Sequence, residues 1–366
     1  MAKKKIARLA AKPEDYQRLG IQKDISPWED GLRTNGKFGE YEWWYSDAKM
    51  EDGSSLVIIF YSQPVTASAF GFCPSMSFSL TKPDGTFISD NVEFKIEDCA
   101  FDREKCCVRL GKDSFFEGDL HNYHIHYQTD KISADMTIRG NAASWRPDTG
   151  HIFFDEKDYF AWLPSVPEGR AEATVVIGDE CLHMSGTGYH DHNWGNKGMF
   201  WLMHHWYWGR AKIGDYQAIT SYITAREKYG YEHFKIFLLL KNGEKLGDDP
   251  QYMTYTQSDP DFDPVTKKHY HKTLVYDYND GSQHYTITYK AENIIEYFTI
   301  ADAKNTAQAK AGALLLGLVK LAKLDPSYIR MTGTVTLDRY ENNEVAEHLE
   351  APGIWEMMYF GLDEDV

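Results

Sequence analysis

Alternation of apolar and polar residues constrains the fold of this chain more than any other feature. It recurs in the segments 121–128 (HNYHIHYQ), 132–139 (ISADMTIR) and 330–340 (RMTGTVTLDRY). Successive side chains of a pleated strand point to opposite faces, so each segment can present one residue set to a core. Denser apolar runs at 56–61 and 354–360 predict strands that are buried on both faces. The chain is therefore expected to be built mainly from β-strands.

Turn signals separate these segments and indicate how they are connected. Asp-Gly or Asn-Gly pairs, which favour tight two-residue turns, stand at positions 52–53, 84–85, 242–243 and 280–281. We expect roughly eighteen strands at the spacing that is typical of barrels and sandwiches. The Pro- and Asp-rich residues 248–264 are expected to form a loop.

Two segments lack strand alternation and are expected to be peripheral helices. Residues 12–19 predict a short N-terminal helix, and residues 306–324, which are rich in Ala, Leu and Lys, predict a longer one. The longer helix would have one apolar face. Either it packs over a barrel mouth, or it forms a lid or a surface helix that makes peripheral contact with a membrane.

An internal repeat indicates that the chain contains two similar halves. Residues 43–50 (WWYSDAKM) and 206–213 (WYWGRAKI) share aromatic residues and an Ala-Lys pair, and each is followed by a turn and an apolar strand. Self-similarity at this distance suggests duplication of one β-unit. We therefore expect an N-terminal tail with a short helix over residues 1–20, then one domain over 21–197 and a second over 198–366.

Composition and charge exclude several functional classes. The 366 residues carry a formal net charge of -16, which disfavours a nucleic-acid partner, and the basic residues between 3 and 12 are interpreted as a solvated tail. No secretory signal and no apolar run of about 18 residues is recognisable. The five cysteines are odd in number and lack metal-site spacing, which favours reduced thiols in a cytoplasmic protein.

The densest polar cluster is the run from Tyr189 to Gly195, which follows a predicted strand at 183–188. It places Tyr189, His190, Asp191, His192 and Asn193 in a row, closed by Trp194. A loop leaving a strand end could aim these groups into a barrel mouth. The alternative is an Asp–His latch that joins the two halves.

A second cluster covers residues 40–47. On a strand, Glu40, Glu42, Trp44 and Ser46 share one face, whereas Tyr41, Trp43, Tyr45 and Asp47 share the other. The aromatic face suits a cationic or polyene ligand, and an ordinary aromatic core is the alternative. The His-x-His pairs at 124–126, 190–192 and 269–271 lie far apart without a third ligand, and nucleotide-binding loops are missing, so no metal and no cofactor are predicted.

Three segments resemble a known family. Residues 42–48 (EWWYSDA), 188–195 (GYHDHNWG) and 353–361 are similar to the carotenoid 1,2-hydratase (hydroxyneurosporene synthase) superfamily, which includes kievitone-hydratase-like proteins and lipocalin-like Diels–Alderases. The resemblance implies two tandem lipocalin-like (calycin) domains with a pocket at or near their junction. It also implies cofactor-independent chemistry on the C=C bonds of a hydrophobic isoprenoid or polyene substrate.

The resemblance transfers to individual residues. His192 and Trp194 stand where the hydratases have functionally important His and Trp residues, and Tyr222 matches a Tyr on the following strand. Two positions later the hydratases have an Asp, whereas this chain has Thr224. This departure weakens the expectation of hydration and leaves cyclisation more open.

Three functions remain in consideration. Acid-initiated hydration would use Asp191 as the proton donor, with Asp47 in reserve and Tyr189, His190 and His192 nearby. A pericyclic cyclase would need only a shaped pocket and one or two hydrogen bonds to the substrate. The third possibility is a non-catalytic lipid or isoprenoid carrier. The residues expected to bind substrate are Trp43, Trp44, Tyr45, Asp47, Asn193, Trp194, Trp206, Trp208 and Tyr222.

Overall fold

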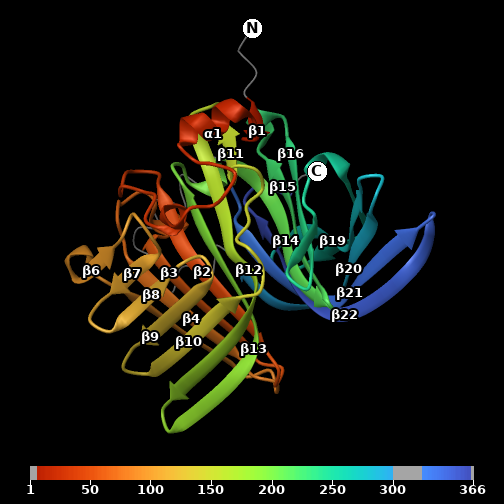
Figure 1. Ribbon diagram of the computed structural model, residues 1–366. Coiled ribbons are helices and arrows are strands. Elements are labelled where there is room, and N and C mark those ends of the chain that lie inside the picture. The colour runs from red at the N-terminus through yellow and green to blue at the C-terminus, as the bar shows by residue number, and fades with distance from the viewer. Residues whose placement is uncertain (1–5, 300–323, 364–366) are drawn as a thin grey trace. The chain divides into compact units, whose positions relative to one another are not determined.

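The computed structural model describes residues 6–299 and 324–363, and most of them lie in β-strands, as predicted (Figure 1). The chain divides into a first unit, residues 9–199, and a second unit, residues 200–366, with which residues 1–8 are grouped. The strands that precede the second unit are β1 (Ala7–Leu9), β2 (Tyr41–Met50), β3 (Ser55–Gln63), β4 (Ser75–Thr81), β5 (Phe87–Glu93), β6 (Cys99–Phe101), β7 (Cys107–Leu110), β8 (Ser114–Gly118), β9 (Asn122–Gln128), β10 (Ile132–Gly140), β11 (His151–Phe154), β12 (Asp158–Ile177) and β13 (Glu180–Gly195).

The second unit continues the same kind of architecture. Its strands are β14 (Met203–Ile213), β15 (Tyr216–Ala225), β16 (His233–Lys241), β17 (Glu244–Gly247), β18 (Met253–Asp263), β19 (Lys268–Asn279), β20 (His284–Thr299), β21 (Ser327–Glu341) and β22 (Glu344–Tyr359). The loop expected over residues 248–264 is wrong, because β18 occupies most of it. As the edge strand of its sheet, β18 exposes alternate side chains to solvent, which explains its polar composition.

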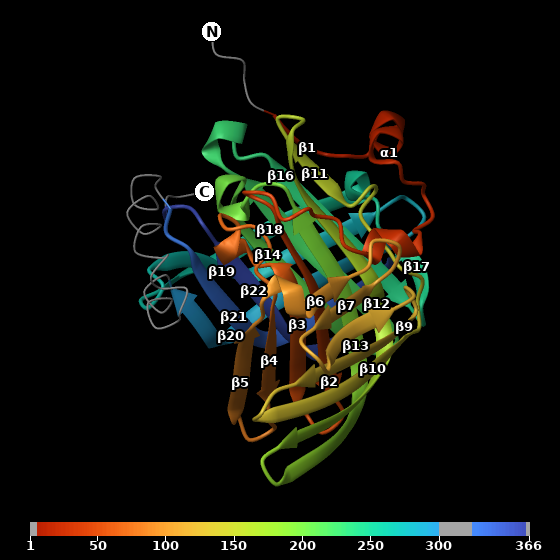
Figure 2. The same ribbon diagram turned by 90° about the vertical axis from the view of Figure 1, so that its left-hand side faces the viewer.

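The two sheets repeat one strand order. In the first unit the order is β5-β4-β3-β2-β13-β12-β10-β9-β8-β7-β6, and Figure 2 shows β9, β10, β12 and β13 side by side. In the second unit the order is β17-β16-β15-β14-β22-β21-β20-β19-β18. In both sheets the first long strand lies between the next strand of the chain and the last one. The predicted duplication is therefore present in the topology, and each curled sheet has the lipocalin-like form that was expected.

Each sheet curls around its own apolar core. Trp44, Phe60, Phe116 and Tyr127 are among the fully buried side chains of the first core. The second core is rich in tyrosine and includes Tyr276, Tyr289 and Trp355. The face of each sheet that carries these residues is its core face, and the opposite face is its outer face.

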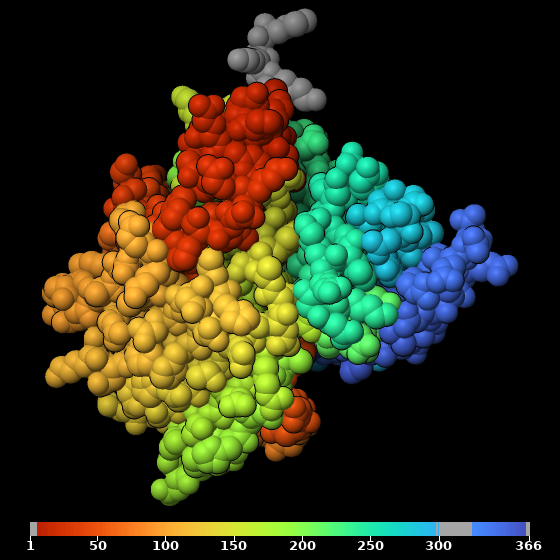
Figure 3. All heavy atoms as spheres, viewed as in Figure 1, coloured from red at the N-terminus to blue at the C-terminus, as the bar shows by residue number. Residues whose placement is uncertain are grey.

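The helices and turns agree with most of the predictions. Helix α1 (Pro13–Leu19) forms as expected and lies at the surface (Figure 3), whereas residues 306–323 lie outside the described part of the chain. The glycines of the four predicted tight turns all have positive φ, which an L side chain rarely adopts. Short 3₁₀ turns complete the structure: η1 (Pro27–Asp30), η2 (Val65–Ala67), η3 (Ile96–Asp98), η4 (Met199–Trp201), η5 (Glu227–Tyr229) and η6 (Pro250–Tyr252).

Two further observations concern the cysteines and the helices. All five cysteines are free thiols, as predicted from their number and spacing. Among the described residues, no helix has both the length and the apolar character that a membrane span requires.

Candidate active site

The polar run predicted to be a loop is the end of strand β13. The strand continues to Gly195 and pairs with β2 throughout this region, from Tyr189 opposite Asp47 to Gly195 opposite Tyr41. The loop prediction for residues 189–195 is therefore wrong. Because side chains alternate along a strand, the run is divided between the two faces of the sheet.

One set of residues from this run lies on the core face. His190, His192 and Trp194 point to the side of the sheet that carries Trp44, which is fully buried. The His192 ring stacks on the ring of Trp44 at a centroid distance of 4.7 Å and lies 4.6 Å from that of Trp194. These residues form a polar layer at one end of the first core.

Glu42 holds this layer together. Its carboxylate lies 2.9 Å from His192 Nε2 and accepts hydrogen bonds from the backbone N–H groups of Arg33 (2.6 Å) and Thr34 (3.0 Å) and from the Thr34 hydroxyl (2.5 Å). The other ring nitrogen of His192 faces the Glu29 carbonyl at 3.3 Å. A buried carboxylate is stable only with such partners, and here they fasten residues 29–34 to the sheet.

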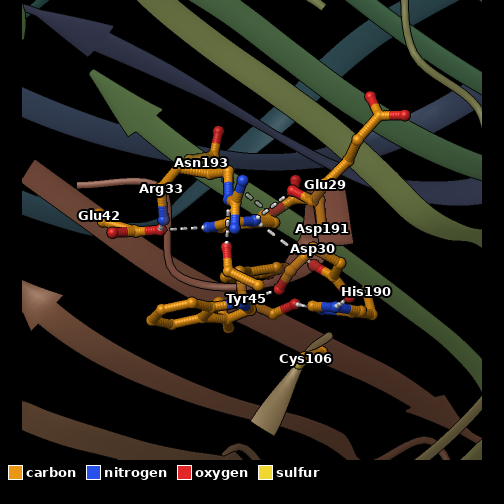
Figure 4. Close-up of polar contacts among 12 residues, drawn as sticks. Glu29, Asp30, Arg33, Glu42, Tyr45, Cys106, His190, Asp191 and Asn193 are labelled. Carbon is orange, nitrogen blue, oxygen red and sulfur yellow. Dashed lines mark hydrogen bonds and ion pairs between the residues drawn. The ribbon is translucent and has the colours of Figure 1, made fainter. Parts of the chain in front are cut away.

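His190 is fixed in the same way. Its Nδ1 donates to the backbone carbonyl of Tyr45 (2.8 Å), and its Nε2 lies 3.3 Å from Asp30 Oδ2 (Figure 4). The Tyr123 hydroxyl donates to the same Asp30 oxygen at 2.5 Å. Burial by itself would raise the pKa of Asp30, but the neighbouring His190 and His192 hold that pKa below its ordinary value.

The same layer contains a possible metal-ligand group. Within the described residues, one set of three side chains brings its ligand atoms within 4.8 Å of one another, namely Asp30, Cys106 and His190. Burial raises the pKa of the Cys106 thiol well above its usual range, which disfavours the thiolate that a metal requires. Structural zinc sites use four ligands, so this set fits a zinc ion poorly.

The outer face of β13 carries a second polar cluster, centred on Asp191. Asp191 Oδ2 accepts hydrogen bonds from the Trp162 indole N–H and from the Tyr189 hydroxyl, both at 2.7 Å. Its Oδ1 accepts a hydrogen bond from the Asn193 side-chain amide, also at 2.7 Å. All four side chains are buried. Figure 4 shows Asp191 and Asn193 together with His190 of the same strand.

Opposing effects determine the pKa of the Asp191 carboxyl. Burial raises its pKa from an ordinary value of 3.8 to about 6, although the hydrogen bonds from Trp162 and Tyr189 and the nearby His190 act in the opposite direction. The nearby Asp47 adds to the increase. A carboxyl group with a pKa of about 6 can both donate and accept a proton near neutral pH, which is the property that acid–base catalysis requires.

The neighbouring strand β2 contributes aromatic residues to the outer face. Trp43, Tyr45 and Asp47 alternate with the core-face residues of that strand, as predicted. The Tyr45 ring meets the Tyr189 ring edge-on at 6.2 Å, and its hydroxyl donates to Asp47 at 3.2 Å. Three predicted site residues thus lie on the same sheet face as Asp191, whereas Trp44 and Trp194 lie on the opposite side.

The remaining predicted residues belong to the second unit. Trp206 and Trp208 alternate with Tyr207 of the second core and so lie on the outer face of strand β14. Tyr222 packs against the core face, where its ring stacks on that of Tyr255 at 3.8 Å. Thr224, in the position of the hydratase Asp, lies between two histidines, 3.3 Å from His205 Nε2 and 3.2 Å from His233 Nδ1.

Several residues of the site were not predicted. Glu42 had a recognisable signal, because strand alternation places it on the same face as Trp44. Asp30 and Trp162 had none, since each lies far from its partner in sequence and only the fold brings them together. Trp162 reaches Asp191 because β12 pairs with β13, with Trp162 opposite Asn193.

The sequence of the chain is similar to that of a known protein family over most of its length. Residues 37–298 match the sequence profile of the Diels-Alderase-like family. The chain belongs to the Diels-Alderase-like family. This confirms the superfamily to which the three sequence segments pointed.

Two curated relatives are similar to parts of this chain. One is the quinolone epoxide rearrangement protein of Emericella nidulans, which is 32% identical over 74 residues, 20% of either chain. The other is a hydroxyneurosporene dehydrogenase of Chlorobaculum tepidum, which is 27% identical over 210 residues, 47% of this chain and 54% of the relative. The chain thus aligns with about half the length, or less, of these relatives.

Solved structures confirm the fold over almost the whole chain. CghA superposes with a TM-score of 0.62 at 11% identity, covering 94% of this chain and 98% of CghA. Kievitone hydratase from Nectria haematococca superposes with a TM-score of 0.53 at 11% identity and the same coverage. At such low identity the similarity concerns the fold alone.

Proposed function

We propose that this protein is an enzyme that acts on C=C bonds of a hydrophobic isoprenoid or polyene substrate, with Asp191 as its acid. The observation that carries the proposal is the buried Asp191 carboxyl, which three donors hold and which has a pKa of about 6. Membership of the Diels-Alderase-like family supports the reaction class. One curated relative is named as an epoxide rearrangement protein and one structural neighbour as a hydratase, so both names denote enzymes.

In the first form of the reaction, Asp191 initiates hydration. Its proton adds to one alkene carbon, the neighbouring carbon becomes a cation, and water attacks that cation and then returns a proton to Asp191. The rings of Trp43, Tyr45 and Trp162 would stabilise the cation through their negative faces. The net change is the addition of one water molecule, so the chemistry needs no cofactor.

In the second form, the substrate cyclises. A linear polyene is held with its reacting ends close together, and two new C–C bonds form at the expense of π bonds, without gain or loss of atoms. Asp191 or Asn193 would then polarise a carbonyl group of the substrate by a hydrogen bond. Thr224 in the position of the hydratase Asp and the family match both favour this form.

The test combines one substitution with an isotope label. A panel of conjugated polyenes and isoprenoids is incubated with the protein in heavy-oxygen water, and the products are analysed by mass spectrometry. A hydration product gains one labelled oxygen, whereas a cyclisation product keeps the mass of the substrate. If the reaction is hydration, Asp191→Asn should reduce turnover by about 10²- to 10⁴-fold, the usual contribution of a general acid.

Asp179→Asn is the matched control, because Asp179 is exposed in the turn between β12 and β13. This variant should retain full turnover. Full activity of the Asp191→Asn protein would remove Asp191 from the mechanism. Recovery of every ligand chemically unchanged after prolonged incubation would favour a carrier and contradict the enzyme proposal.

A further inference from the structure

The second unit carries a carboxyl group at the position that corresponds to Asp191. In the first sheet Asp191 pairs with Tyr45, and in the second sheet Glu356 pairs with Trp208. The internal repeat aligns Tyr45 with Trp208. Glu356 alternates with the core residues of strand β22 and so lies on the outer face, as Asp191 does in its own sheet. The duplication has therefore kept an acid at one register position in both units.

The hydrogen-bond donor on the neighbouring strand is repeated as well. Trp162 of β12 stands opposite Asn193, two residues beyond the first acid, and donates to that acid at 2.7 Å. Tyr328 of β21 stands opposite Met358, two residues beyond the second acid, and its hydroxyl donates to Glu356 Oε2, also at 2.7 Å. An acid and its cross-strand donor thus recur together, which a chance surface glutamate would not show.

Burial and the polar neighbours of Glu356 act in opposite directions on the pKa of its carboxyl. Burial raises the pKa of this carboxyl above its ordinary value, although Tyr328, Trp206 and Arg330 act in the opposite direction. The guanidinium of Arg330 forms an ion pair with Glu296 at 3.1 Å, so its charge is shared between two carboxyls. A protonated carboxyl in an apolar setting is a hydrogen-bond donor, as in other sites that hold a carbonyl oxygen.

We propose that Glu356, with Tyr328 and Trp206, forms a second ligand site that binds a carbonyl group at the polar end of the polyene substrate. The inference rests on the proposed function, because it assumes that the ligand is a polyene. Ile354 and Met358 share the outer face of β22 with Glu356 and provide apolar contact for the chain that bears the carbonyl. A carboxylic acid satisfies a carbonyl oxygen by donating one hydrogen bond, whereas a carboxylate would repel it.

The test uses all-trans-retinal, a polyene with a carbonyl group, and axerophtene, the hydrocarbon in which a methyl group replaces the aldehyde, as probes of the full-length protein. Resonance Raman spectroscopy reports the C=O stretch of bound retinal, which falls in frequency when the oxygen accepts a hydrogen bond. At a pH low enough to protonate Glu356, the expected result is a lowered frequency in the unsubstituted protein and the free value in Glu356→Ala. Retinal affinity should fall about tenfold in that variant, the value of one good hydrogen bond, while axerophtene affinity stays unchanged.

Two further variants keep the test independent of misfolding. Glu356→Gln has nearly the same shape and retains an N–H donor, so the C=O shift of bound retinal should persist. In this variant the shift should also be independent of pH, whereas in the unsubstituted protein it disappears when Glu356 ionises. Glu350→Ala, at an exposed position of the same strand, should behave as the unsubstituted protein. The titratable neighbours Glu296, Arg330 and Tyr328 are retained in all of these variants.

The outcomes separate this inference from the proposed function. Asp191→Asn should lose turnover yet keep the retinal C=O shift, because the two acids belong to different sheets. An unchanged shift and unchanged retinal affinity in Glu356→Ala would overturn the inference and leave Asp191 untouched. Failure of the unsubstituted protein to bind either retinoid would contradict the proposed polyene substrate and overturn the inference with it.

Discussion

Asp191 combines burial with three hydrogen-bond donors, and this balance determines what the residue can do. Burial favours the neutral carboxyl, whereas donors from Trp162, Tyr189 and Asn193 favour the carboxylate. The net result is a pKa of about 6, so both protonation states are populated within one or two pH units of neutrality. His190 and His192, which are more familiar acid–base residues, have both ring nitrogens engaged by oxygen atoms of the first unit.

Tyr189→Phe tests this balance at the level of one atom. The substitution removes a hydrogen bond that favours the ionised form of Asp191, so the pKa of Asp191 should rise above 6. An acid-dependent reaction loses activity as pH rises through that pKa, and the falling limb of its kcat/KM profile should therefore move to higher pH by about one unit. If the falling limb of the kcat/KM profile lay at the same pH in Tyr189→Phe and in the unsubstituted protein, the Tyr189 hydroxyl would not influence the pKa of Asp191.

At the scale of elements, strand β13 places different chemistry on the two faces of one sheet. Its run of polar residues resembles a loop, and the loop prediction followed from that polarity. The run can be a buried strand because residues 29–42 and Trp162 supply hydrogen-bond partners, and these partners are remote in sequence. Alternation and Asp-Gly turns, by contrast, are local signals, which explains why the strands around it were predicted correctly.

Glu42→Gln tests whether the core-face network stabilises this element. The Glu42 carboxylate accepts hydrogen bonds from Arg33 and Thr34 and contacts His192, and a Gln side chain would turn an NH₂ group toward some of these donors. We expect a loss of about 2–4 kcal/mol in the free energy of unfolding, measured with urea at neutral pH. Glu51→Gln, at an exposed turn, should change it by less than about 0.5 kcal/mol. Equal stability of the two variants would contradict the assigned role.

At the scale of the whole molecule, the two units repeat one strand order, and the sequence repeat made this duplication predictable. The aromatic repeat at 43–50 and 206–213 is recognisable because aromatic residues and an Ala-Lys pair recur in the same order, and both copies occupy the same position in their sheets. The acid of the second copy was not predicted as a site residue. Glu356 follows Trp355 in an apolar run, and only strand register reveals that it corresponds to Asp191.

The most direct test of the central claim is a ¹³C NMR titration of the aspartate side-chain carboxyls in the unsubstituted protein and in Asp191→Asn. One carboxyl resonance should titrate with a midpoint near pH 6 and be missing from the spectrum of the variant. This result would establish a buried acid that is available near neutral pH. If instead both proteins gave the same resonances above pH 5, and every aspartate titrated below pH 4, Asp191 could not be the proposed acid.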